Sequence, residues 1–118
     1  MTGDRRRCHG AVVTHPFSGR HARVAETLLA EGVDALVVVN SSNIRYLTGF
    51  AGTAGVLVLT AGCLYLLVDF RYSSAVARLV RDGVAPPALV PVSLEGSAGY
   101  DRRLAELVAT EGWSRVGF

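Results

Sequence analysis

Residues 43–55 read Asn43-Ile-Arg-Tyr46-Leu-Thr-Gly49-Phe50-Ala-Gly52-Thr-Ala-Gly55, and they separate two apolar runs. The run before them, residues 35–39, is apolar without alternation, as is typical of a strand covered on both faces. The run after them, residues 56–60, begins a second strand. We therefore expect a glycine-rich crossover between two strands, on which aromatic side chains are either packed beneath the chain or held out for a partner.

Three further segments have the apolar period of amphipathic helices. They span residues 19–31, which Ser18 caps and Gly32 stops, residues 70–82 behind Asp69, and residues 98–111 before Gly112. Their buried stripes are expected from Val24, Ala25, Leu28 and Leu29 in the first, Tyr72, Val76, Leu79 and Val80 in the second, and Tyr100, Leu104, Leu107 and Val108 in the third.

The remaining apolar runs predict the other strands of the sheet. Residues 61–62 join two such runs, which favours an antiparallel hairpin. Pro91 within residues 88–93 indicates an edge strand, and residues 115–118 start one more strand. Helices alternating with strands, one pair of them a hairpin, predict an α/β layered domain with a mixed sheet.

Composition limits the classes of function. A chain of 118 residues makes one domain, and Asp, Arg or Gly interrupts every apolar run before it could span a bilayer. We expect a cytoplasmic protein without a membrane partner, because the start of the chain is no signal peptide. All 12 basic residues are arginines, but they are scattered and matched by 10 acids, so no nucleic-acid surface is expected.

No motif in the chain specifies catalysis by itself. The spacing of Gly49, Gly52 and Gly55 is neither the dinucleotide fingerprint nor the P-loop. Cys8, His9, His15 and His21 match no metal-ligand spacing, and we expect them to be solvated side chains, whereas Cys63 is expected to be a small buried residue. The carboxylates that flank strands, Asp34 and Asp69, are too few for a two-metal site. The residues alone therefore do not indicate an enzyme.

Aromatic residues near the crossover and the second helix remain as candidates: Tyr46, Phe50, Phe70 and Tyr72. Tyr72 starts a helical stripe, so we expect it in the core. The crossover offers little apolar cover, and we expect Phe50 to be held out for function and Tyr46 to be packed.

Taken together, residues 43–55, the short hairpin and Asp69-Phe-Arg71-Tyr72 closely resemble the N-terminal domain of the creatinase and prolidase family. The Gly-Phe-x-Gly-Thr-Ala-Gly run is most similar to Xaa-Pro aminopeptidases (aminopeptidase P). The resemblance covers roughly residues 20–118. Family members often have Gly where Phe70 stands, so the turn into the following helix is expected to differ here.

The resemblance implies a ribonuclease H-like mixed sheet flanked by helices, formed by residues 18–118 after a loose lead of residues 1–17. It also implies a two-domain peptidase whose larger domain, absent from this chain, holds two divalent metal ions such as manganese. The N-terminal domain would help to assemble a homo-oligomer and would wall the substrate entrance. Tyr46, Phe50, Phe70, Arg71 and Tyr72 are the candidates for that entrance or interface.

Our leading hypothesis is the non-catalytic N-terminal domain of an Xaa-Pro metallopeptidase, inactive alone and partnered by its own catalytic domain and neighbouring subunits. The unfinished strand at residues 115–118 favours it. The alternatives are a small α/β module that binds an anion at the glycine-rich crossover and a metal-dependent nuclease on a ribonuclease H-like sheet, which the sparse acids disfavour.

Overall fold

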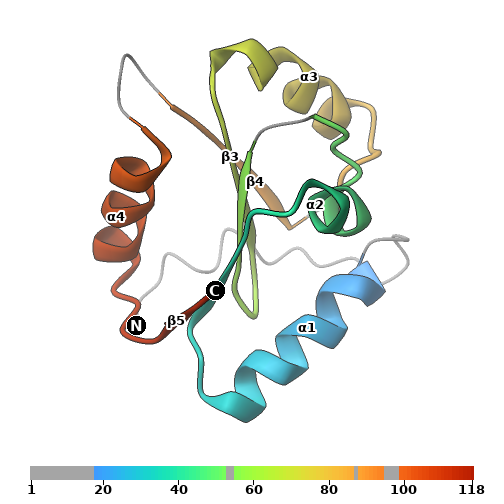
Figure 1. Ribbon diagram of the computed structural model, residues 1–118. Helices are drawn as coiled ribbons and strands as arrows, with labels where there is room; N and C mark the ends of the chain where they lie inside the picture. The colour runs from blue at the N-terminus through green and yellow to red at the C-terminus, as the bar shows by residue number, and fades with distance from the viewer. Residues whose placement is uncertain (1–17, 53–54, 87, 95–98) are drawn as a thin grey trace.

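The computed structural model describes residues 18–52, 55–86, 88–94 and 99–118, apart from the side chains of Ser18 and Phe70 (Figure 1). The expected lead of residues 1–17 lies outside the described residues. In chain order the elements are α1 (Ser18–Glu31), β1 (Ala35–Val38), α2 (Ser41–Thr48), β2 (Val56–Leu59), β3 (Leu64–Val68), α3 (Phe70–Arg81), β4 (Leu89–Ser93), α4 (Tyr100–Glu111) and β5 (Val116–Gly117).

These strands form one mixed five-stranded sheet in the order β4-β3-β2-β1-β5. The central strand β2 runs antiparallel to both β1 and β3, whereas β4 and β5 run parallel to their neighbours. Pro91 pairs with Leu66 on the edge strand β4, where its missing N–H costs no ladder hydrogen bond on the solvent side. The predictions of a mixed α/β sheet and of an edge strand at Pro91 are confirmed.

The hairpin between β2 and β3 has a longer turn than the two residues predicted. Leu59 pairs with Leu64, so residues 60–63 form the connection. The Thr60 hydroxyl accepts hydrogen bonds from the backbone N–H groups of Gly62, at 3.3 Å, and Cys63, at 2.9 Å. A threonine that binds the backbone of its own turn is therefore what closes this hairpin.

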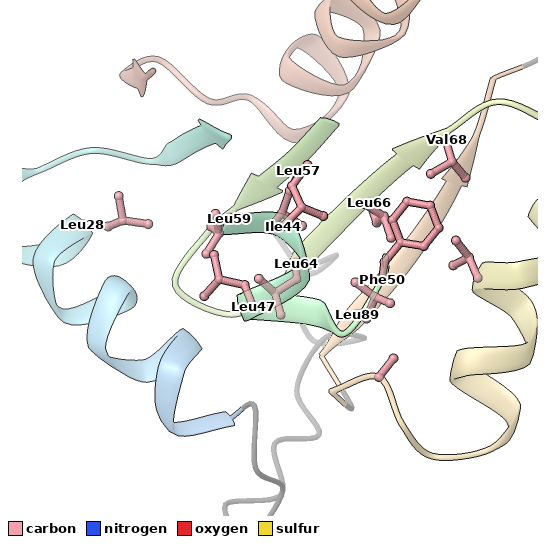
Figure 2. Close-up of a cluster of buried hydrophobic side chains, with 12 residues drawn as sticks. Leu28, Ile44, Leu47, Phe50, Leu57, Leu59, Leu64, Leu66, Val68 and Leu89 are labelled. Carbon is pink, nitrogen blue, oxygen red and sulfur yellow. The ribbon is translucent and has the colours of Figure 1, made fainter. Parts of the chain in front are cut away.

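Helices cover both faces of the sheet, with α1, α2 and α3 on one side and α4 on the other (Figure 1). Alternate residues of β2 point to the two faces, so Leu57 and Leu59 join one core cluster and Val56 and Val58 the other. The first core cluster, drawn in Figure 2, comprises Leu28, Ile44, Leu47, Phe50, Leu57, Leu59, Leu64, Leu66, Val68, Val76, Ala85 and Leu89. The second core cluster comprises Ala35, Val37, Val56, Val58, Cys63, Tyr65, Leu67, Val92 and Leu107.

The expected crossover contains a helix, α2, that the sequence analysis missed. Its N-cap is Asn40, whose side chain accepts a hydrogen bond of 3.1 Å from the N–H of Asn43. It ends at Gly49, which has φ 84° and donates its N–H to the carbonyl of Arg45 at 2.8 Å. Ile44, Leu47 and Thr48 are its buried residues, at the spacing of a helix face.

Two residues assigned to buried stripes are exposed instead. Leu29 in α1 is 70% exposed and Val80 in α3 is 44% exposed, whereas their neighbours Leu28 and Leu79 contact the first core cluster. Successive residues of a helix point about 100° apart, so both members of such a pair cannot face the sheet. None of the described helices is long and apolar enough to cross a membrane.

Candidate functional site

The predicted site residues Arg71 and Tyr72 lie where the parallel strands β3 and β4 end. Val68 and Ser93 are paired at that edge, and α3 begins directly after β3. The start of α4 lies close by, since the charges of Asp69 and Arg71 both affect the pKa of Tyr100, its first residue. We call Asp69, Arg71, Tyr72 and Tyr100 the carboxyl-edge cluster; ligands of α/β sheets bind preferentially at such edges.

Asp69 caps α3 and holds Arg71 in a fixed orientation. Its carboxylate accepts a 2.9 Å hydrogen bond from the Arg71 N–H and further bonds from Arg71 Nε and Nη2, the last at 2.8 Å. The hydrogen bonds from Arg71 hold the pKa of Asp69 below its ordinary value, and the same pairing raises the pKa of Arg71. The Arg71 side chain remains 65% exposed, so the pair presents an oriented guanidinium to solvent.

No distortion accompanies Phe70 at the start of α3. Asp69 has an extended backbone with φ −80°, and among the described residues only glycines have positive φ. The helix therefore starts without a left-handed residue, as a Phe at position 70 requires, and the expected difference from the turn of family members stays a prediction. Phe70 is the first residue of α3, and its side chain lies outside the described part of the chain.

The structure places Phe50 and Tyr46 the other way round from our expectation. Phe50 is only 3% exposed, and its ring meets that of Tyr72 edge to face at 5.6 Å between centroids. Figure 2 shows Phe50 beside Leu66, Val68 and Leu89 of the first core cluster. The crossover finds apolar cover because α2 and α3 close over the sheet on this side, which the sequence pattern did not reveal.

Tyr46 is the exposed aromatic of the pair. Its side chain is 51% exposed on α2, and the guanidinium of Arg20 lies 4.2 Å from the centre of its ring. Arg20 Nη1 also donates a 2.6 Å hydrogen bond to the Tyr46 carbonyl. These contacts tie α1 to α2 and hold the tyrosine ring at the surface, as a cation–π pair can do.

Tyr100 is the member of the carboxyl-edge cluster that sequence reasoning missed as a site residue. Its hydroxyl is buried and forms no hydrogen bond of standard geometry with the described residues. Burial is the main cause that raises the pKa of Tyr100, and the charge of Asp69 adds to it, while Arg71 opposes both. The signal in the sequence is the position of Tyr100 near the start of a predicted helix. The pattern of that helix placed Tyr100 in the buried stripe and indicated no other role.

The described residues offer little for other chemistries. No group of three metal-binding side chains comes together among them. His21, expected to be solvated, is buried in α1 at 7% exposure, and its Nε2 lies 2.8 Å from the Thr60 carbonyl oxygen. It was misassigned because it lies inside the first amphipathic helix rather than in the lead before it.

The structure explains why two of the three positions in the crossover are occupied by glycine. Gly49 ends α2, and a Cβ on Gly52 would lie 2.2 Å from Cζ of Phe50. The third, Gly55, leads into β2 rather than into a helix N-terminus, which is where anions bind. The described residues of the crossover therefore favour packing over an anion site.

Comparison with known proteins agrees with this architecture. The family described as the Creatinase/Prolidase N-terminal domain matches residues 20–118. The aminopeptidase P of Streptococcus thermophilus is 24% identical, with a TM-score of 0.70 over 86% of this chain and 73% of that chain. The N-terminal domain of cytoplasmic peptidase PepQ from Mycobacterium tuberculosis H37Rv is 29% identical, with a TM-score of 0.68 over 85% of this chain and 72% of that chain.

Two longer relatives show how much of a peptidase this domain covers. The Xaa-Pro dipeptidase of Bacillus anthracis is 22% identical, with a TM-score of 0.68 over 85% of this chain but only 26% of its own. The uncharacterized peptidase YqhT of Bacillus subtilis (strain 168) is 38% identical over 42 residues, which are 36% of this chain and 12% of YqhT. With the family matched over residues 20–118 and the fold shared with N-terminal domains of peptidases, the chain belongs to the creatinase/prolidase N-terminal domain family.

Proposed function

We propose that this chain is the non-catalytic N-terminal domain of a metal-dependent Xaa-Pro peptidase of the aminopeptidase P or prolidase type. The observation that carries the proposal is the family match over residues 20–118, supported by the likeness to the N-terminal domain of PepQ. Catalysis then belongs to a second domain that holds two divalent metal ions such as manganese. PepQ is described as cytoplasmic, which supports the same address here.

In this proposal the domain helps to assemble subunits and walls the substrate entrance. Arg71 is suited to that role because Asp69 engages its Nε and Nη2, so little side-chain freedom is left to lose on binding. Its remaining N–H groups can bind a carbonyl or carboxylate of a peptide or of a neighbouring subunit. Tyr46, fixed by Arg20, supplies a rigid and exposed aromatic surface.

The other candidates take supporting places in the same proposal. Phe50 is buried behind Tyr72, so it orients that ring instead of touching a substrate. Phe70 precedes Arg71 at the start of α3 and stays a candidate for the interface.

The test is made in the peptidase that joins this domain to its catalytic domain. Arg71→Ala and Tyr46→Ala are expected to lower kcat/KM for Xaa-Pro peptides by roughly tenfold, or to weaken the oligomer, because each removes about 1–3 kcal/mol of contact energy. Val80→Ala is the matched control, since Val80 is also exposed but lies away from the start of α3. Unchanged kcat/KM and unchanged assembly in both variants would remove the role proposed for these residues.

A further inference from the structure

The two sides of the sheet are covered unequally. Among the described residues, α1, α2 and α3 lie on one side and α4 is the only helix on the other (Figure 1). A helix with its side chains is about 10 Å wide, whereas five strands spaced about 4.8 Å apart span roughly 20 Å. One helix cannot cover a sheet of that width, so part of the α4 side is left without a described helix.

An open groove lies on this side, between α4 and the edge strand β5, with a volume of about 640 Å³. Most of its lining is apolar: Leu104, Ala105, Val108, Ala109, Val116 and Phe118. Asp101, in the first turn of α4, is the only charged residue that lines it. The groove therefore offers contact to an apolar partner and little to a charged one.

Phe118 adds an exposed aromatic ring to the rim of the groove. Its side chain is 89% exposed, more than that of any other large apolar residue that the structure describes. It directly follows β5, the outer strand of the sheet, and no described strand lies beyond β5. An aromatic ring beside an apolar groove is typical of a surface that is buried in an assembled protein.

The proposed function supplies a partner for this groove, and the present inference rests on it. This chain covers only 26% of the Xaa-Pro dipeptidase of Bacillus anthracis, so most of a peptidase of that length lies outside the matched domain. The similar domain of PepQ is described as N-terminal, so in the proposed peptidase the polypeptide continues from β5 toward the catalytic domain. Val116 and Phe118 line the groove, so that continuation starts beside it.

We propose that this groove is the docking surface for an apolar segment of the catalytic domain of the same polypeptide. A segment tethered beside the groove has an effective concentration on the order of millimolar, which favours it over a free molecule of the same chemistry. Ala105, Ala109 and Gly112 lie along one stripe of α4, and their small size lets a partner approach the helix closely. Trp113 and Val116 already pack against the second core cluster, so docking here extends the core of the domain.

Single lysines placed in the groove test the docking. Ala109→Lys and Ala105→Lys each put a charge among its apolar side chains, and Ala77→Lys, at an exposed alanine of α3, is the matched control. The three variants and the unmodified sequence are made both as the 118-residue chain and joined to the catalytic domain. Each joined protein is digested with chymotrypsin, which does not cut after lysine, and the rate of cleavage between the two domains is measured.

Cleavage between the domains should be roughly tenfold faster in Ala109→Lys and in Ala105→Lys, because docking would have to desolvate the lysine charge. It should not change in Ala77→Lys. The cleavage rate follows the population of the undocked form when docking and undocking are fast. In the 118-residue chain, all three variants should unfold at the temperature of the unmodified chain, because each of these alanines is exposed there.

Equal cleavage rates in all the joined proteins would overturn the proposal. A lower unfolding temperature of the two groove variants than of Ala77→Lys in the 118-residue chain would overturn it as well, because the groove would then be covered within residues 1–118. A dimer of the 118-residue chain that Ala109→Lys dissociates would contradict it in favour of a second copy.

Hydrolysis of an Xaa-Pro peptide by the unmodified joined protein is measured separately, since the cleavage comparison does not depend on activity. Equal cleavage rates in an active joined protein would remove the docking surface and leave the proposed function standing. An inactive joined protein would count against the proposed function, while faster cleavage in the two groove variants would still support the docking surface.

Discussion

At the scale of single residues, Phe50 is a packing residue of the core, whereas Tyr46 belongs to the surface. Phe50→Ala should cost about 3–5 kcal/mol of unfolding free energy, because it empties a place in the first core cluster. Tyr46→Ala, which removes a half-exposed ring, should cost about 1 kcal/mol or less. Urea unfolding of both variants measures the difference, and equal costs would contradict the assignment of Phe50 to the core.

Gly52 tests the same packing from the backbone side. Gly52→Ala would bring a Cβ to within 2.2 Å of the Phe50 ring, so we expect a loss of about 1–3 kcal/mol from overpacking. Gly62→Ala is the matched control, since no atom lies within 4 Å of the added Cβ there. In a Phe50→Leu background the cost of Gly52→Ala should shrink, because the ring atoms in its way are gone. A cost that is independent of residue 50 would mean that something else requires this glycine.

At the scale of elements, the N-terminus of α3 should make stability depend on pH. The pKa of Asp69 is lower in the folded chain than its ordinary value of 3.8, chiefly through its hydrogen bond with Arg71. A depressed pKa stabilises the fold above the unfolded pKa, and this contribution is lost as the pH falls through the folded pKa. The free energy of unfolding is measured between pH 6 and pH 2, roughly the range in which carboxylates titrate. It should therefore fall less toward low pH in Asp69→Asn than in the unmodified chain.

Glu26→Gln serves as the control for that experiment, because Glu26 is an exposed carboxylate in the middle of α1. It should follow the unmodified chain through the titration. An Asp69→Asn profile parallel to that of the unmodified chain would show that the pairing with Arg71 does not contribute.

For the individual elements, the sequence predicted those features that depend on the local apolar period and on the residues that begin or end a helix or strand. The three long helices, the strands, the start of a helix behind Asp69 and the edge position of Pro91 all follow from such signals. The helix α2 was missed because Asn40, Ser41 and Ser42 look like a turn, and the eight-residue helix that follows is stabilised mainly by packing. The burial of Phe50 and the approach of Tyr100 to Asp69 depend on contacts between distant segments, which no local pattern contains.

At the scale of the whole molecule, the two core clusters share the strands β2 and β3. Loss of either cluster exposes the sheet that supports the other, so the chain should unfold in one cooperative transition by itself. Far-ultraviolet circular dichroism follows all helices, and Trp113 fluorescence follows the side covered by α4. Coincident thermal transitions are expected, and a separate, earlier fluorescence transition would show that the α4 side unfolds independently.

The central claim of the proposed function is that catalysis belongs to a second domain that holds metal ions, and that this domain serves it. The most direct measurement is hydrolysis of an Xaa-Pro peptide by the purified 118-residue chain, with manganese, cobalt or zinc added, beside the same domain joined to its catalytic domain. We expect no turnover above the blank from the chain alone, because its described residues bring no three metal ligands together for a two-metal site. Turnover by the chain alone that a chelator abolishes would contradict the account.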